Sequence, residues 1–223
     1  GNSNTVTMSG NITSTGDNIY GIYIYNSTSS SITMSGDMTL SDGYGMMIQD
    51  SDSNTLTMTG DITSTEGDYA VGAYFYNSDS NILTVRNITS VGTISGWGIL
   101  LTGSDSNTIN INGKVSASGG DNNAITADST SDNNTITFNQ GSKIIGGLYN
   151  DGTNNTLTFN LGRAASYNFT TSGAVNWVLE DTSKPIVEGS AKSMGVADID
   201  NQAHILYRRM DPVNDVLSER QRL

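Results

Sequence analysis

A short cassette recurs along the chain and constrains its fold more than any other feature. It reads "GNSNTVTMSG" at the start and "DSDSNTLTMTG" from Asp50, with further copies from Ser104, Ser131 and Gly152. The residues that open each alternating run are spaced by 26, 24, 27, 26, 27 and 21 positions. These residues are Asn4, Ser30, Asn54, Asn81, Asn107, Asn134 and Asn155. A β-rich repeat of this length predicts a solenoid, in which each coil packs on its neighbours.

Alternation within each cassette divides its side chains between two faces. Successive side chains of a strand point to opposite sides, so Leu56 and Met58 face one way while Thr55 and Thr57 face the other. A later run in the same unit, "VGAYFYN", alternates in the same way. Stacked about 4.8 Å apart, the apolar positions of successive coils would form one core. We therefore predict an all-β fold, a right-handed parallel β-helix of about 25 residues per coil. The structural alternative is an antiparallel sandwich.

The repeat ends before the C-terminus of the chain. We expect residues 1–190 to form the β-helix, with a terminal capping region from about 162, and residues 191–223 to form a helical tail. From Val196 onward the apolar residues lie three or four positions apart, as on one face of a helix. Asp211 fits a helix N-cap and Pro212 fits the first helical position.

The charge of the chain excludes some classes of partner. The formal net charge is −12, and residues 1–162 hold 14 acidic residues against only three basic ones. Nucleic-acid binding needs cationic groups facing phosphates, so we expect no nucleic-acid partner. The chain has no cysteine, which rules out disulfides and zinc–thiolate sites within it. The chain has no run of 18 apolar residues, so we expect no transmembrane helix. No signal peptide is recognisable either, so export would require a leader outside this sequence.

The asparagine that follows each turn suggests a structural role. Stacked identical amides can bond to the amides above and below them, and asparagine tolerates the left-handed backbone of a corner. We predict an asparagine ladder at these corners. Its members are Asn54, Asn81, Asn107, Asn134 and Asn155.

The same turn offers a candidate metal site. Asp50, Asp52 and Asn54 present the D-x-D-x-N spacing of oxygen ligands that can hold calcium. However, the later glycine and bidentate glutamate of an EF-hand loop are missing. The alternative is a solvated turn in which Asp and Ser bond to their own backbone. We expect no cofactor, with Ca2+ as the alternative.

Two outward-facing surfaces are candidates for binding. The later strand of each unit predicts a partner-binding face that includes tyrosines and a leucine. Its residues are Tyr23, Tyr25, Tyr74, Tyr76 and Leu100. The earlier strand presents a Thr-x-Thr array, interrupted by Ile82 and Asn110, which is similar to the ice-binding face of some β-solenoid antifreeze proteins. High β propensity and good cross-strand pairing of threonine explain the same array without a ligand.

The sequence gives little support to catalysis. The only histidine is His204, far from the repeats, and no G-x-S-x-G motif is present. The basic residues Arg86, Lys114 and Lys143 are scattered singly, which makes the basic centre of a polysaccharide lyase hard to assemble. We therefore expect no enzymatic activity. A polysaccharide-degrading β-helix enzyme stays open as an alternative, because pairs of carboxylates in space cannot be read from spacing.

The repeats and the tail together resemble one known family. Segments such as "SNTLTMTGDITST" and "NNTITF" look like the passenger domains of bacterial autotransporters (type V secretion). "YNFTTSGAVNWVLEDTS" resembles the last passenger coils, and "VADIDNQAHILYRRMDPVNDVLSERQRL" is similar to the linker before the membrane barrel.

The resemblance implies a bacterial cell-surface, outer-membrane or extracellular location after export. It also implies an outer-membrane barrel in the same polypeptide, which is missing from this sequence. Passengers without protease or esterase motifs are mostly adhesins or structural stalks, and this step is an analogy at the level of the fold. We therefore expect a non-enzymatic adhesin or stalk. Its partner would be a surface protein or glycan of a host or neighbouring cell, or another copy of itself.

Overall fold

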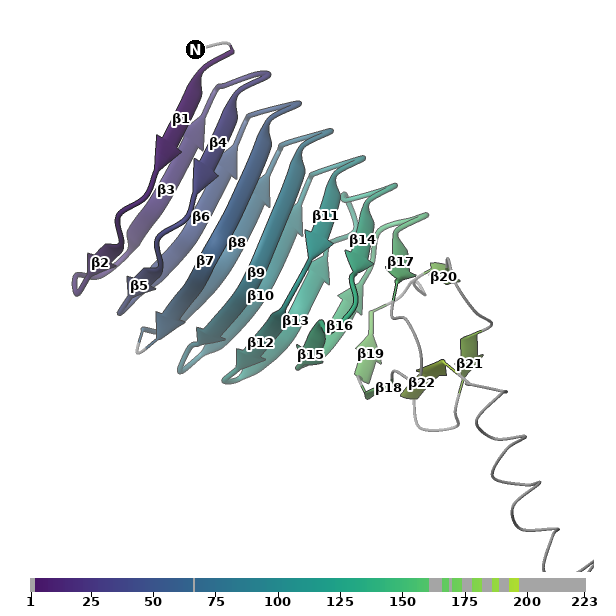
Figure 1. Ribbon diagram of the computed structural model, residues 1–223. Helices are drawn as coiled ribbons and strands as arrows, with labels where there is room; N and C mark the ends of the chain where they lie inside the picture. The colour runs from purple at the N-terminus through teal and green to yellow at the C-terminus, as the bar shows by residue number, and fades with distance from the viewer. Residues whose placement is uncertain are drawn as a thin grey trace, which may run out of the picture.

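The computed structural model is an all-β solenoid of about six turns with roughly 26 residues per turn. It describes residues 3–65, 67–160, 166–168, 170–173, 178–181, 186–188 and 193–196. The predicted parallel solenoid is confirmed. In Figure 1 the near strands run downward, the far strands run upward and successive coils advance to the right, which is a right-handed winding.

Within the described residues the coils form two long sheets. The first, twelve-stranded sheet contains β1 (Thr5–Met8), β2 (Ile12–Ser14), β4 (Ser31–Met34), β5 (Met38–Leu40), β7 (Thr55–Thr65), β9 (Ile82–Val91), β11 (Thr108–Ile111), β12 (Lys114–Ser118), β14 (Thr135–Phe138), β15 (Lys143–Ile145), β17 (Thr156–Phe159) and β20 (Val178–Asp181). The second, seven-stranded sheet contains β3 (Ile19–Tyr25), β6 (Gly43–Gln49), β8 (Tyr69–Tyr76), β10 (Ser95–Thr102), β13 (Asp121–Ala127), β16 (Gly147–Asn150) and β19 (Thr170–Ser172).

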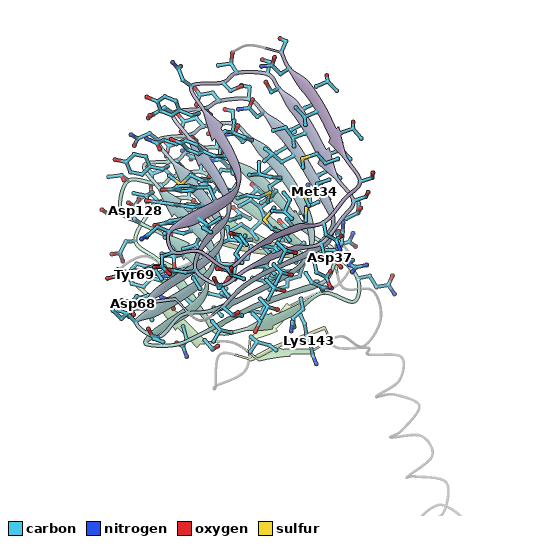
Figure 2. All side chains as sticks on the ribbon, turned by 90° about the vertical axis from the view of Figure 1, so that its left-hand side faces the viewer. Met34, Asp37, Asp68, Tyr69, Asp128 and Lys143 are labelled. Carbon is cyan, nitrogen blue, oxygen red and sulfur yellow. The ribbon has the colours of Figure 1, made fainter. Side chains whose placement is uncertain are left out.

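Neighbouring coils pair in parallel and keep the repeat in register. Leu56 of β7 lies opposite Ile32 of β4 on one side and Leu83 of β9 on the other. Each coil therefore places an apolar side chain over the one before it, as the alternation predicts. Figure 2 looks along the solenoid and shows Met34 in the interior between the two sheets.

The core changes in character along the axis. Methionines fill the first coils, including Met34, Met38 and Met46, each no more than 1% exposed. In the last coils Phe138 stacks on Phe159 with ring centroids 5.3 Å apart. Flexible methionines fill irregular gaps, whereas stacked aromatics define one arrangement.

Glycines bring the two sheets close together at one level of the second sheet. A Cβ atom added to Gly45 would lie 2.4 Å from Ile62 Cγ2 of the first sheet and 2.4 Å from the carbonyl oxygen of Gly72. Gly21, Gly45 and Gly72 occupy corresponding places in β3, β6 and β8. At these glycines the alternation of inward and outward side chains is interrupted. Residues before the glycine, such as Tyr20 and Tyr44, therefore lie on the opposite face from the one that strict alternation predicts.

The C-terminal part is only partly described. A third, three-stranded sheet contains β18 (Ser166–Asn168), β21 (Ile186–Glu188) and β22 (Ser193–Val196), with β22 in the middle and antiparallel to both others. The end of the predicted β-helix at residue 190 falls between β21 and β22. Within the predicted helical tail, residues 193–196 form a strand because they pair with β18 and β21. The rest of that tail lies outside the described residues.

Candidate functional site

The corner that precedes each strand of the first sheet holds a column of buried amides. The side-chain nitrogen of Asn54 donates to Oδ1 of Asn81 at 3.0 Å, and that of Asn81 donates to Oδ1 of Asn107 at 3.2 Å. The column continues through Asn134 to Asn155 with distances of 3.1 and 3.0 Å. All five side chains are 0% exposed. Each Oδ1 also accepts the backbone N–H of the corresponding residue in the preceding coil, from Ser30 to Asn134. The five residues expected to form a ladder are therefore stacked, and they tie adjacent corners together.

The left-handed backbone falls on a different residue from the one expected. The residue before each ladder asparagine has a positive φ, for example 58° at Ser53 and 57° at Ser80. The expectation that asparagine itself takes this conformation is wrong for the five ladder residues. The side chain of Asn54 instead turns inward to reach the next coil, while Ser53 makes the turn.

Sequence reasoning missed a second column beside the amides. The backbone N–H of Ser27 donates to Oγ of Ser51 at 3.1 Å, and the same contact links Ser51 to Ser78, Ser78 to Ser104 and Ser104 to Ser131. Ser51, Ser78, Ser104 and Ser131 are 0% exposed. The signal was the serine three places before four of the five ladder asparagines, and it was interpreted only as part of a solvated turn.

The structure separates the three calcium candidates. Asp50 and Asp52 are exposed, while Asn54 is buried and its oxygen accepts the backbone N–H of Ser30 at 2.9 Å. Oδ1 of Asp52 accepts the backbone N–H of Asp79 at 2.8 Å. Among the described residues no group of three or more His, Cys, Asp or Glu side chains is placed to hold a metal ion. The carboxylate of Asp52 therefore links its own corner to the corner of the next coil at the surface.

The outer side of the second sheet carries a strip of aromatic rings. We call it the aromatic face. It consists of Tyr20, Tyr23, Tyr25, Tyr44, Tyr69, Tyr74, Tyr76 and Trp97, from strands β3, β6, β8 and β10. Four of its tyrosines are 46–56% exposed. Figure 2 shows one of them, Tyr69, on the outside of the solenoid.

The rings of this face contact one another within a coil and between coils. Tyr20 stacks on Tyr23 and on Tyr44, each with ring centroids 5.1 Å apart, and Tyr44 stacks on Tyr74 at 5.8 Å. Tyr69 stacks on Trp97 at 6.3 Å. A ring held by its neighbours loses little further freedom when a ligand binds it, which favours recognition.

The sequence located only half of this face. Tyr23, Tyr25, Tyr74 and Tyr76 lie on it as expected, and Leu100 is half-buried in register with Tyr74. Four aromatic members were not found from the sequence: Tyr20, Tyr44, Tyr69 and Trp97. Met47, which alternation places outward, is only 7% exposed because it lies between Tyr23 and Tyr74 in the register.

Burial and negative charge raise the pKa of phenols on this face. The pKa of Tyr44 is raised first by burial and then by nearby groups that include Tyr20 and Asp42. The pKa of Tyr74 is also raised chiefly by burial. A raised pKa favours the protonated phenol, which can donate a hydrogen bond.

A cleft adjoins the aromatic face at later coils of the same sheet. It has a volume of about 520 Å3, and its lining includes Trp97, Asp121, Asn123, Thr126 and Tyr149. The hydroxyl of Tyr149 donates to Oδ2 of Asp151 at 2.5 Å, which fixes that ring at one side. Thr126 is 8% exposed, and its hydroxyl has no hydrogen-bond partner among the described residues. Leaving a buried polar group unpaired costs about 1–3 kcal/mol.

The opposite sheet carries the threonine array in regular register. Thr7, Thr33, Thr57 and Thr84 lie side by side on four successive strands. Asn110 then interrupts this column, and Ile82 interrupts the neighbouring one. A further column was missed. It consists of Thr13, Thr39, Thr63, Thr89 and Ser116.

The basic residues of the described part are dispersed as expected, except for one neighbouring pair. Arg86 forms an ion pair with Asp61 at 2.7 Å, while Lys114 lies opposite Lys143 in the register.

Among the residues that the structure describes, no helix is long and apolar enough to cross a bilayer. No protein-family model, curated protein or solved structure matches the chain.

Proposed function

We propose that the chain is a non-enzymatic adhesion module that binds a partner through the aromatic face. The observation that carries the proposal is the strip of stacked, partly exposed rings on β3, β6, β8 and β10. Tyrosine and tryptophan supply large contact areas at low entropic cost, and they dominate the energetics of binding surfaces. An exposed aromatic surface of this extent is a recognition site on a soluble scaffold.

The solenoid gives this surface a rigid and extended form. Hydrogen bonds run between coils at every strand and through the corner ladders, so the face stays regular over many coils. This architecture suits a stalk that presents an adhesive side. Together with the resemblance of the repeats and the tail, it supports an autotransporter passenger on a bacterial surface, joined to an outer-membrane barrel. The partner would be a glycan or protein of another cell.

Removing two exposed rings tests the adhesive role. Displayed on a non-adherent bacterium, the chain should promote attachment to cells or to its own kind. The double variant Tyr23→Ala/Tyr25→Ala should reduce the number of attached cells at least about tenfold, because hot-spot aromatics each contribute about 2 kcal/mol or more. The measurement is a count of attached cells at equal display, judged with an antibody to an added tag.

The matched control lies on the same coil but on the other sheet. Thr5→Ala/Thr7→Ala removes two exposed side chains of β1, and we expect it to leave attachment unchanged. Equal attachment by the tyrosine variant and the parent chain, with both displayed, would contradict the use of the aromatic face. A chain that promotes no attachment at all would contradict the adhesive function itself.

A second candidate function, ice binding, is favoured by the register of the threonine columns. Hydroxyls at Thr7, Thr33, Thr57 and Thr84 repeat at the spacing of stacked strands, about 4.8 Å. A regular polar lattice of this kind could order water as ice does. Purified protein should then lower the freezing point below the melting point, and Thr57→Lys should abolish this gap. Freezing and melting at one temperature, measured by nanolitre osmometry, would exclude the ice-binding candidate.

A further inference from the structure

The cleft beside the aromatic face has the composition of a small-ligand site. Trp97 and Tyr149 supply aromatic surfaces, while Asp121 and Asn123 supply a carboxylate and an amide. Oδ2 of Asp121 accepts from the hydroxyl of Ser95 at 3.1 Å, which holds the carboxylate in place. A volume of about 520 Å3 suits a ligand of one or two small rings.

Thr126 points to a ligand independently of this composition. Its side chain is more than nine-tenths buried and lines the cleft, yet its hydroxyl has no hydrogen-bond partner in the described part of the chain. Thr126 lies in register with Leu100 on one side and Tyr149 on the other, in the middle of the outer face. Buried hydroxyls are normally paired, so an orphaned one lining a cleft calls for a partner from outside the protein.

The surrounding charge selects the kind of ligand. Asp121 lines the cleft. The pKa of Tyr149 is raised first by its hydrogen bond to Asp151, then by burial, and further by the negative charges of Asp151 and Asp128. Three carboxylates therefore lie in or near the cleft. Figure 2 shows Asp128 on the same side of the solenoid as Tyr69. Such a surface repels phosphates, sulfates and uronic acids. It suits a neutral ligand that has hydroxyls to pair and C–H faces to stack on aromatic rings.

We propose that this cleft holds one or two rings of a neutral carbohydrate. The ring would stack on Trp97, with a hydroxyl paired to Thr126 and others to Asp121 and Asn123. The rest of the glycan would run onto the adjoining aromatic face. This inference rests on the proposed function, because it names what the adhesive face holds.

The experiment measures binding of defined oligosaccharides to the purified chain. Cellohexaose, maltohexaose and mannohexaose serve as neutral probes, and hexagalacturonate serves as the anionic probe. We expect at least one neutral probe to bind saturably, with a change in tryptophan fluorescence because Trp97 lines the cleft. The anionic probe should not bind at the same concentration, and heat measured by calorimetry provides a second readout.

Thr126→Val is the decisive variant because it replaces only the hydroxyl by a methyl group. We expect it to weaken binding of the neutral probe about tenfold. Its urea midpoint should stay unchanged or rise, because the orphaned hydroxyl is removed. Thr84→Val, on the outer side of the opposite sheet, is the matched control and should bind as the parent chain does.

Three results would overturn the carbohydrate inference. The first is that no neutral probe binds at about 10 mM, and the second is that the anionic probe binds as well as the neutral ones. The third is that Thr126→Val binds the neutral probe with the affinity of the parent chain. The attachment assay separates these failures from failure of the adhesive function. Attachment that persists after glycans are stripped from the target cells assigns the aromatic face to a protein partner and overturns the inference alone. Saturable sugar binding without any attachment leaves the cleft assigned and overturns the adhesive function.

Discussion

The variant Asn107→Ala should lose about 3–5 kcal/mol of the free energy of unfolding, the largest effect we expect from a polar substitution in this chain. Asn107 lies in the middle of the buried ladder and makes side-chain hydrogen bonds to both adjacent coils. Truncation would leave the backbone N–H of Asn81 and the carbonyl of Ser78 without the partners they now have. Both residues are 0% exposed, so water cannot replace Asn107. Each orphaned group costs about 1–3 kcal/mol.

Urea unfolding followed by circular dichroism measures this loss, with Asn139→Ala as the control. Asn139 belongs to another amide column, where its nitrogen donates to Oδ1 of Asn112 at 2.8 Å, but this contact is exposed to solvent. We expect the control to lose less than about 1 kcal/mol, because water satisfies the remaining groups. If the two variants unfold at the same urea concentration, burial of the ladder does not account for its contribution to stability.

The sequence predicted the coil because one physical constraint repeats in every turn. Apolar residues at alternate positions must stack on those of the next coil, so the period and the inward set could both be read directly. Leu56, Met58 and Phe75 are buried as the alternation requires. The ladder asparagines were visible for the same reason, since a residue that must bond to its own copy recurs at the same place in each coil.

Features that depend on local backbone geometry could not be read in this way. The glycine at position 21 interrupts the alternation of β3, so Tyr20 is 46% exposed although it is two places before the inward Ile22. The face of Tyr44 changes in the same way beside Gly45. Period-two reasoning therefore missed Tyr20 and Tyr44 as members of the aromatic face. The orphaned hydroxyl of Thr126 was also invisible, because the absence of a partner is known only when the neighbouring coils are in place.

The core should be most sensitive where a large ring fills the space between the sheets. Phe75 on β8 is 0% exposed and lies in register with Ile48 and Leu101, so it contacts the coils on both sides. Phe75→Ala should lose about 3–5 kcal/mol, from the lost burial of the ring and from the cavity left behind. In a solenoid the two interfaces of one coil are weakened together, because each coil is stabilised mainly by its neighbours.

The adjacent Tyr76 provides a control of similar size on the other side of the same strand. Tyr76 is half-buried on the aromatic face, where its ring meets Tyr74 edge-on with centroids 5.9 Å apart. Tyr76→Ala removes a similar number of atoms but leaves no internal cavity, so we expect a loss of less than about 1.5 kcal/mol. Urea midpoints of the two variants measure the difference. If Tyr76→Ala is as destabilising as Phe75→Ala, the aromatic face stabilises the solenoid itself. That result would contradict the assignment of its tyrosines to partner binding alone.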